Sequence, residues 1–154
     1  MQIEIKNLAP LRVAFVRHVG PYHEVGQTWE KLCNWAGRSG LMGPDVRFLG
    51  ASYDDPEVTP PDKLRYDACL AVDASIEPEG EVGVQEVGGG RYAVALHEGP
   101  YEDFKDTYGK IYGGWFPEQD CDPGAPPCLE FYLNDPESTD PEDLLTEVWV
   151  PIST

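Results

Sequence analysis

The chain alternates short apolar stretches with two longer segments in which apolar residues recur at helical spacing. Eight stretches have the composition and alternation of β-strands: residues 2–6, 11–18, 46–53, 64–72, 82–87, 91–98, 128–134 and 144–151. Apolar residues spaced by four, three and four positions predict a helix over 22–38, and a similar series predicts a second helix over 101–115. The first series is Val25, Trp29, Leu32 and Ala36, and the second is Tyr101, Phe104, Tyr108, Ile111 and Trp115.

Glycine and proline mark where these elements end. Gly20-Pro21 separates the second strand from the first helix, and proline suits the first turn of a helix. The first two strands are expected to form a hairpin through the turn at 7–10, and Gly88-Gly89-Gly90 is expected to be the turn of a second hairpin. Residues 116–127, with four prolines and several acids, are expected to form a loop.

The second half of the chain repeats the first. His97-Glu98-Gly99-Pro100-Tyr101 follows His18-Val19-Gly20-Pro21-Tyr22 by 79 residues, and Glu147 follows Asp67 by 80. We therefore expect a single domain over 1–154, made of two pseudo-symmetric strand-helix-strand-strand repeats at about 1–76 and 82–154, with a central cleft as the place for a ligand. The fold class is α+β, with about eight antiparallel strands and two helices.

The charge of the chain narrows the set of partners. Its 28 acidic and 11 basic residues give a formal net charge of -17, which repels nucleic-acid phosphates and anionic membranes and attracts cations. No segment has the pattern of a signal peptide or the roughly 18 apolar residues of a membrane span, so a cytoplasmic protein is expected. The four cysteines form no C-x-x-C pair and are expected to be reduced, and neither a metal nor a cofactor is expected.

Glu147 is the residue whose chemistry stands out. Alternation places Leu145, Glu147 and Trp149 on one face of a strand that is expected to be central and covered at least partly on both sides. A carboxylate enclosed there needs a replacement for its water. A lipophilic cation would supply it, since a neighbouring ring adds about 0.5–2 kcal/mol through cation–π attraction. The alternative is an arginine or lysine from a neighbouring strand, or a position at an exposed edge, and the sequence leaves both open.

Three further residues are candidates for the same site. Asp67 is a weaker one, because Arg65 lies two residues before it on the same face of the strand and is expected to neutralise it. Tyr101 and Trp115 belong to the aromatic stripe of the second helix. That stripe lines either the core or the cleft.

The chain has few signs of a common catalytic mechanism. His18 and His97 precede the two helices and are expected to hydrogen-bond the strand-to-helix turn, with acid–base catalysis as the alternative. No G-x-S-x-G, Walker or H-E-x-x-H motif is present, so the usual nucleophilic and metal mechanisms have no motif support.

Three features together resemble the GyrI-like small-molecule-binding domain. They are the doubled H-x-G-P-Y before a helix, the D-P-E-x-T-x-P loop followed by Leu64-Arg65-Tyr66-Asp67-Ala68-Cys69, and the closing Thr146-Glu147-Val148-Trp149-Val150-Pro151-Ile152. The likeness covers nearly the whole chain. This family includes the DNA gyrase inhibitor SbmC and the effector-binding half of multidrug-sensing AraC-type and MerR-type regulators. The helix-turn-helix of those regulators has no counterpart here, so direct transcriptional control is not expected.

The resemblance implies a fold and three functions. The fold has two strand-helix-strand-strand modules about a pseudo-twofold axis, with a cleft for aromatic cations or other hydrophobic compounds and a buried glutamate at the position of Glu147. The first function, which Glu147 beside Trp149 and the acidic balance also indicate, is that of a stand-alone binding protein that captures toxic or signalling small molecules. The second is inhibition of DNA gyrase through protein contact, without direct binding of nucleic acid. The third is hydrolysis of electrophilic cyclopropane-containing toxins, in which Glu147 would be the catalytic residue that activates water.

Overall fold

The structure is a computed structural model that describes residues 2–153 of the chain. It contains eight β-strands and two α-helices among the described residues, and they divide into two compact units. The first unit is Pro10–Gly88, and the second combines Met1–Ala9 with Gly89–Thr154. The strands are β1 Ile3–Leu8, β2 Leu11–Val19, β3 Phe48–Ser52, β4 Arg65–Ala71, β5 Gly83–Val87, β6 Gly90–Glu98, β7 Cys128–Tyr132 and β8 Leu145–Pro151.

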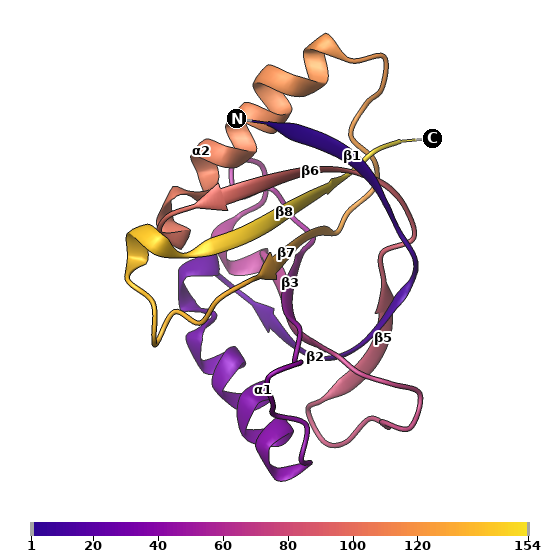
Figure 1. The fold of residues 1–154 in the computed structure, drawn as a ribbon, viewed down its shortest axis with the longest axis vertical. Coiled ribbons are helices and arrows are strands. Elements are labelled where there is room, and N and C mark those ends of the chain that lie inside the picture. Colours follow the sequence, from indigo (N-terminus) through magenta and orange to yellow (C-terminus); the bar gives the residue numbers. More distant parts are fainter. Residues whose placement is uncertain (1, 154) are drawn as a thin grey trace. The chain divides into compact units, whose positions relative to one another are not determined.

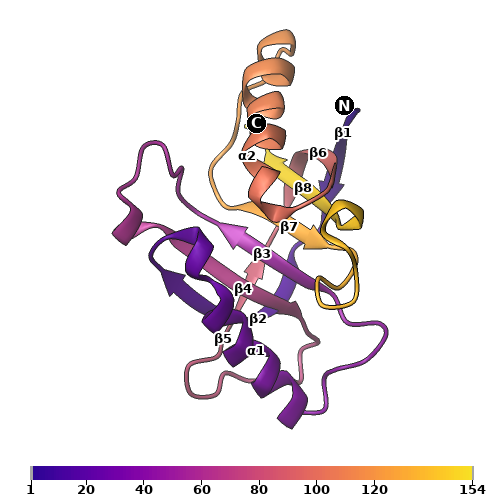
Figure 2. The same cartoon turned by 90° about the vertical axis from the view of Figure 1, so that its left-hand side faces the viewer.

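The first unit is an antiparallel sheet of four strands with one helix on its face. The strand order is β3-β4-β2-β5, and helix α1, Gly26–Arg38, lies against β2 and β4 (Figure 2). The predicted apolar stripe of this helix meets the alternate side chains of the two central strands. Together they form one core of buried residues: Ala14, Val16, Leu32, Trp35, Ala36, Tyr66, Ala68, Leu70 and Val82.

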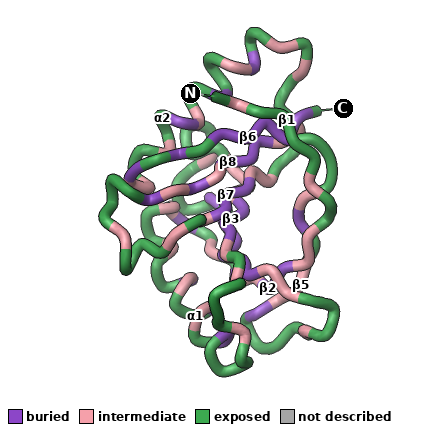
Figure 3. Tube along the Cα trace, in the orientation of Figure 1, coloured by how far each residue is buried: buried purple, intermediate pink, exposed green. Residues whose placement is uncertain are grey.

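The second unit has the same design. Its strand order is β1-β6-β8-β7, so the strand that carries Glu147 is central, as predicted. Helix α2, Phe104–Gly109, continues into a π-helical segment, Lys110–Trp115, and both lie over one face of this sheet (Figure 1). Buried residues, purple in Figure 3, run along β6 and β8. The core between helix and sheet is Ala93, Ala95, Ile111, Phe116, Val148, Val150 and Ile152.

The two predicted hairpins are wrong. Strand β1 pairs with β6, Ile3 opposite Ala95, and β5 pairs with β2, Leu11 opposite Val87. Strand β1, which precedes the first repeat in the sequence, therefore belongs to the second unit, and β5, which precedes the second repeat, belongs to the first unit. Gly88, Gly89 and Gly90 have φ values of 88°, 87° and 101°, which only glycine adopts readily in succession, and they carry the chain onward from one unit to the next.

The other predicted elements are confirmed with small shifts of their ends. In each unit the chain runs strand, helix, strand, strand, as β2-α1-β3-β4 and as β6-α2-β7-β8, so the α+β fold class is confirmed. Residues 119–127 form a loop, and all four cysteines are free thiols. The cleft between the repeats and the single-domain interpretation stay predictions.

No helix among residues 2–153 is both long enough and apolar enough to cross a membrane.

Candidate functional site

Glu147 lies on the face of its sheet that α2 does not cover. It is opposite Leu96 on β6 and Phe131 on β7, and paired residues of an antiparallel sheet point to the same side. The core beneath α2 uses the other set of β8 residues, among them Val148 and Val150. Leu145, Glu147 and Trp149 therefore share one face, as the alternation predicted.

An aromatic cluster adjoins the carboxylate. The Trp149 ring meets Tyr92 at 5.7 Å and Phe131 at 5.6 Å between centroids, both edge to face. All three rings are buried, and the indole N–H of Trp149 donates to Oε1 of Glu147 at 3.3 Å. One carboxylate oxygen is thus oriented by a buried ring, which holds the side chain in place on the sheet.

The surroundings of Glu147 are otherwise apolar and open. Its own side chain is partly exposed, and among the described residues no lysine, arginine or histidine forms an ion pair with it. Leu96, beside it on β6, is 43% exposed. Leu133 follows β7, its amide donates to the Leu145 carbonyl at 3.0 Å, and its side chain is 51% exposed. A charged group with two exposed leucines at its rim suits a ligand that is both cationic and apolar.

Asp67, the residue that matches Glu147, has a very different environment. It is fully buried and receives two bonds from Arg17, Nε to Oδ1 at 2.8 Å and Nη2 to Oδ2 at 2.9 Å. The Tyr53 hydroxyl at 3.0 Å and the Gln85 amide at 2.8 Å also donate to Oδ2. Its charge is therefore balanced by Arg17 from the neighbouring strand, and its hydrogen-bonding capacity is used within the protein.

The sheet register makes the two carboxylates directly comparable. Arg17 is opposite Asp67, and Leu96, 79 residues further along, is opposite Glu147. Leu133 likewise follows Tyr53 by 80 residues, the same offset that separates Glu147 from Asp67, so Leu133 is the counterpart of Tyr53 in the second repeat. The second unit thus keeps the carboxylate of the repeat but has leucines in place of its cationic and phenolic partners.

The predicted partner of Asp67 is wrong. Arg65 pairs with Asp54, Nη2 to Oδ1 at 3.0 Å and Nε to Oδ2 at 3.0 Å, and the Arg65 amide also donates to Asp54. The Arg65 guanidinium accordingly lowers the pKa of Asp54. Two residues along one strand share a face but lie about 7 Å apart by the rise of a strand, whereas Arg17 lies directly opposite Asp67.

Tyr101 and Trp115 lie on the other face of the second sheet. Trp115 packs against the core beneath α2 and meets Phe116 edge-on at 5.0 Å. Tyr101 contacts Tyr132 at 5.5 Å, and Tyr132 is opposite Thr146, on the face away from Glu147. The structure therefore brings together Leu145, Glu147 and Trp149 but places these two rings with the helix.

The structural role of the two histidines is confirmed. His18 Nε2 bonds the Pro21 carbonyl at 2.9 Å, and His97 Nε2 bonds the Pro100 carbonyl at 2.9 Å. The Nδ1 of His97 is 2.6 Å from the Thr107 hydroxyl of α2. Because a carbonyl only accepts, Nε2 carries the proton in both rings, and each ring ties a strand end to the turn that follows it.

Glu130 is a buried carboxylate that the sequence did not single out. It is 7% exposed and receives the Tyr108 hydroxyl at 2.6 Å and the Tyr132 hydroxyl at 2.9 Å. Burial raises the pKa of Glu130, and burial together with this charge raises the pKa of Tyr108 well above its usual range. The available signal was an acid between the apolar Leu129 and Phe131 of a predicted strand.

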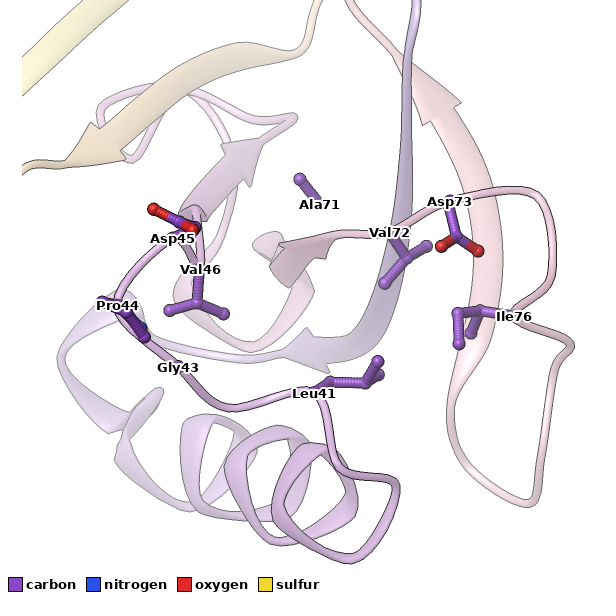
Figure 4. A pocket seen from close by; sticks show the side chains of 9 residues that line it. All are labelled: Leu41, Gly43, Pro44, Asp45, Val46, Ala71, Val72, Asp73 and Ile76. Carbon is purple, nitrogen blue, oxygen red and sulfur yellow. The ribbon is translucent and has the colours of Figure 1, made fainter.

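A separate hollow of about 290 Å³ lies in the first unit (Figure 4). Leu41, Val46, Val72 and Ile76 surround it, with Asp45 and Asp73 also in its lining, and it contains no aromatic ring. It holds none of the predicted site residues. Nor do any three histidine, cysteine, aspartate or glutamate side chains within residues 2–153 lie close enough together to hold a metal ion.

Relatives support the resemblance seen in the sequence. The family model for the GyrI-like small molecule binding domain matches residues 1–153. The probable transcriptional regulator YgiV of Escherichia coli (strain K12) is 30% identical over 156 residues, which cover 99% of this chain and 97% of that protein. The DNA gyrase inhibitor of Enterobacter lignolyticus (strain SCF1) is 32% identical over 139 residues, 88% of this chain and 87% of that protein.

Three solved structures share the fold at lower identity. The EcmrR–DNA complex aligns with a TM-score of 0.78 at 17% identity over 99% of this chain, which spans 57% of the EcmrR chain. A hydrolase from Listeria innocua aligns at 0.70 with 15% identity, over 99% of this chain and 92% of that one. SAV2435 bound to tetraphenylphosphonium aligns at 0.63 with 16% identity, over 99% and 94%. These likenesses concern the fold alone.

Proposed function

The chain belongs to the GyrI-like family of small-molecule binding domains, and from this premise we propose that its ligand is a lipophilic or aromatic cation held by Glu147. One observation carries the proposal. The repeat places a carboxylate opposite an arginine in the first unit and opposite an exposed leucine in the second. A ligand cation would take at Glu147 the part that Arg17 takes at Asp67.

Each neighbouring side chain has a role in this proposal. Glu147 supplies the charge, and Trp149 holds its carboxylate through the indole N–H. Leu96, Leu133 and Leu145 offer apolar surface, worth about 0.8 kcal/mol for each ligand CH₂ that they bury. An aromatic ring next to a bound cation contributes about 0.5–2 kcal/mol. These contributions favour a cation with a bulky apolar body over a small hydrated ion.

Tetraphenylphosphonium, a probe of the required chemistry, tests the proposal together with the uncharged triphenylphosphine oxide. We expect saturable quenching of tryptophan fluorescence by the cation and a weaker response to the neutral compound. Glu147→Gln keeps the shape of the side chain and is expected to weaken cation binding by about tenfold or more, because the bound cation then has no counter-charge. Glu102→Gln, at an exposed glutamate of the same unit, is the matched control.

A second variant tests the comparison with Asp67 directly. Leu96→Arg places a guanidinium opposite Glu147 in the register that Arg17 has opposite Asp67. We expect this internal cation to abolish binding of tetraphenylphosphonium without unfolding the protein. Unchanged affinity in both Glu147→Gln and Leu96→Arg would refute the proposed site.

Inhibition of DNA gyrase through protein contact is the alternative. Two observations favour it. Some relatives are named DNA gyrase inhibitors, and a net charge of -17 would suit binding to the surface of gyrase that normally holds DNA. A supercoiling assay with protein in large excess over gyrase tests it, and undiminished supercoiling would contradict it.

A hydrolase is the third candidate. The hydrolase from Listeria innocua shares the fold, and Glu147 beside Trp149 has the chemistry of a general base that activates water. The test is turnover of an electrophilic cyclopropane substrate, followed by product formation. Turnover must be lost in Glu147→Gln, since a product formed equally by that variant would exclude Glu147 as the base.

A further inference from the structure

The guanidinium of Arg17 lies in surroundings that match those of a bound ligand. Its two bonds to Asp67 form a fork of 2.8 and 2.9 Å, the geometry in which a carboxylate binds a planar cation. Its central carbon lies 5.1 Å from the Tyr53 ring centroid and 5.7 Å from that of Phe15. A carboxylate at the base and two rings at the side form a cation-binding box.

Groups other than Arg17 also contact the residues of the box. The Tyr53 hydroxyl and the Gln85 amide hold Oδ2 of Asp67 in place. Burial and the Asp67 charge raise the pKa of Tyr53 to about 12, so its hydroxyl remains a donor at neutral pH. Phe15 in turn lies against Gly83, where an added Cβ would be 2.7 Å from the ring. Phe15, Asp67 and Gln85 come from β2, β4 and β5, and Tyr53 directly follows β3.

We propose that the first unit contains a second cation site, formed by Asp67, Tyr53, Phe15 and Gln85, and that Arg17 is its resident occupant. The class of ligand is a small planar monocation of the guanidinium or amidinium type. Arg17 lies between Asp67 and the solvent, because the Arg17 side chain is 43% exposed whereas that of Asp67 is fully buried. Removing the Arg17 side chain therefore leaves a buried anion at the bottom of an opening that a solute can enter.

This inference rests on the proposed function, since both sites use the carboxylate of the repeat. It also predicts how many cations the native protein binds. The native protein has one open position, at Glu147, and one filled position, at Asp67. Arg17 is the residue that keeps the first unit from binding a ligand. Leu96 is its counterpart and leaves the second unit open.

Chemical rescue of Arg17→Ala tests the proposal. We expect this variant to unfold at a lower temperature than the wild type, and millimolar guanidinium or methylguanidinium to restore part of the loss in a saturable way. Tetramethylammonium at equal ionic strength controls for charge without planarity. Should the variant not fold unaided, the same ions are compared by the yield of folded protein on refolding. The wild type, whose site is filled, should show no such gain.

A double variant decides whether the rescue uses Asp67. In Arg17→Ala/Asp67→Asn the base of the box is neutral, so guanidinium should have no stabilising effect beyond that of tetramethylammonium. Equal responses of the single and double variants, or equal effects of the two ions, would overturn the proposal. Neither result depends on Glu147. Loss of tetraphenylphosphonium binding in Glu147→Gln tests the proposed function separately, so either inference can fail without the other.

Discussion

Tyr108→Phe is expected to lower the free energy of unfolding through one hydrogen bond. The Tyr108 hydroxyl donates to Oε2 of Glu130 at 2.6 Å, and Tyr132 donates to the other oxygen at 2.9 Å. Glu130 is 7% exposed, and within the described residues no lysine or arginine forms an ion pair with it. The two hydroxyls thus replace much of the hydration that this carboxylate loses on folding.

The expected size follows from the charge of the acceptor. A hydrogen bond to a charged group contributes about 1.5–3 kcal/mol, and phenylalanine keeps the ring and its packing. We therefore expect Tyr108→Phe to cost about 2 kcal/mol. In a chain of this length that loss corresponds to a fall in Tm of about 4–8 °C.

A double-mutant cycle with Glu130→Gln isolates the bond. The glutamine amide still bonds a tyrosine hydroxyl, but as a neutral pair worth about 1 kcal/mol. Urea unfolding of the four proteins should show a smaller loss from Tyr108→Phe in the Glu130→Gln background, with a coupling of about 1 kcal/mol. Tyr101→Phe is the control, because Tyr101 contacts Phe104 and Tyr132 through its ring. Its expected effect is within about 0.5 kcal/mol.

The cycle has a clear refuting result. If Tyr108→Phe cost the same with Glu130 and with glutamine, the loss would come from the packing of the ring and not from the charged bond. A control variant as destabilising as Tyr108→Phe would lead to the same conclusion.

Three further predictions concern pH, packing and thiol chemistry. Burial raises the pKa of Glu130 in the folded state, so the wild type loses stability as the pH rises from about 4.3, the usual value of a glutamate, through the folded pKa. Glu130→Gln has no such proton to lose and should gain stability relative to the wild type over that range. Urea titrations at several pH values test this, and a stability difference that does not change with pH would contradict it. Gly83→Ala should lower Tm by displacing the Phe15 ring, 2.7 Å from the new Cβ, and an unchanged Tm would show that the ring moves freely. Burial raises the pKa of the Cys69 thiol well above its usual value, so a thiol reagent should modify Cys69 only after the protein unfolds. Mass spectrometry that finds Cys69 labelled in the native protein would refute this.

Local patterns in the sequence determined the parts of the structure that depend on neighbours along the chain. Helical spacing located both helices, and alternation placed Leu145, Glu147 and Trp149 on one face of a central strand. The repeated H-x-G-P-Y located the two histidines that bond their own turns three residues away. Period and turn chemistry act over a few residues, so one sequence is enough to infer them.

Partners far apart in the sequence were decided only by the tertiary structure. Asp67 pairs with Arg17, 50 residues away, and not with the nearby Arg65. Glu130 and Tyr108, which come from a strand and a helix, meet only because α2 lies over that face of the sheet. Strands β1 and β5 pair outside their predicted hairpins, since edge pairing depends on where connections lead the chain and not on the strands' own composition. Register across a sheet is a long-range property, and it is what shows Glu147 opposite a leucine where its counterpart has an arginine.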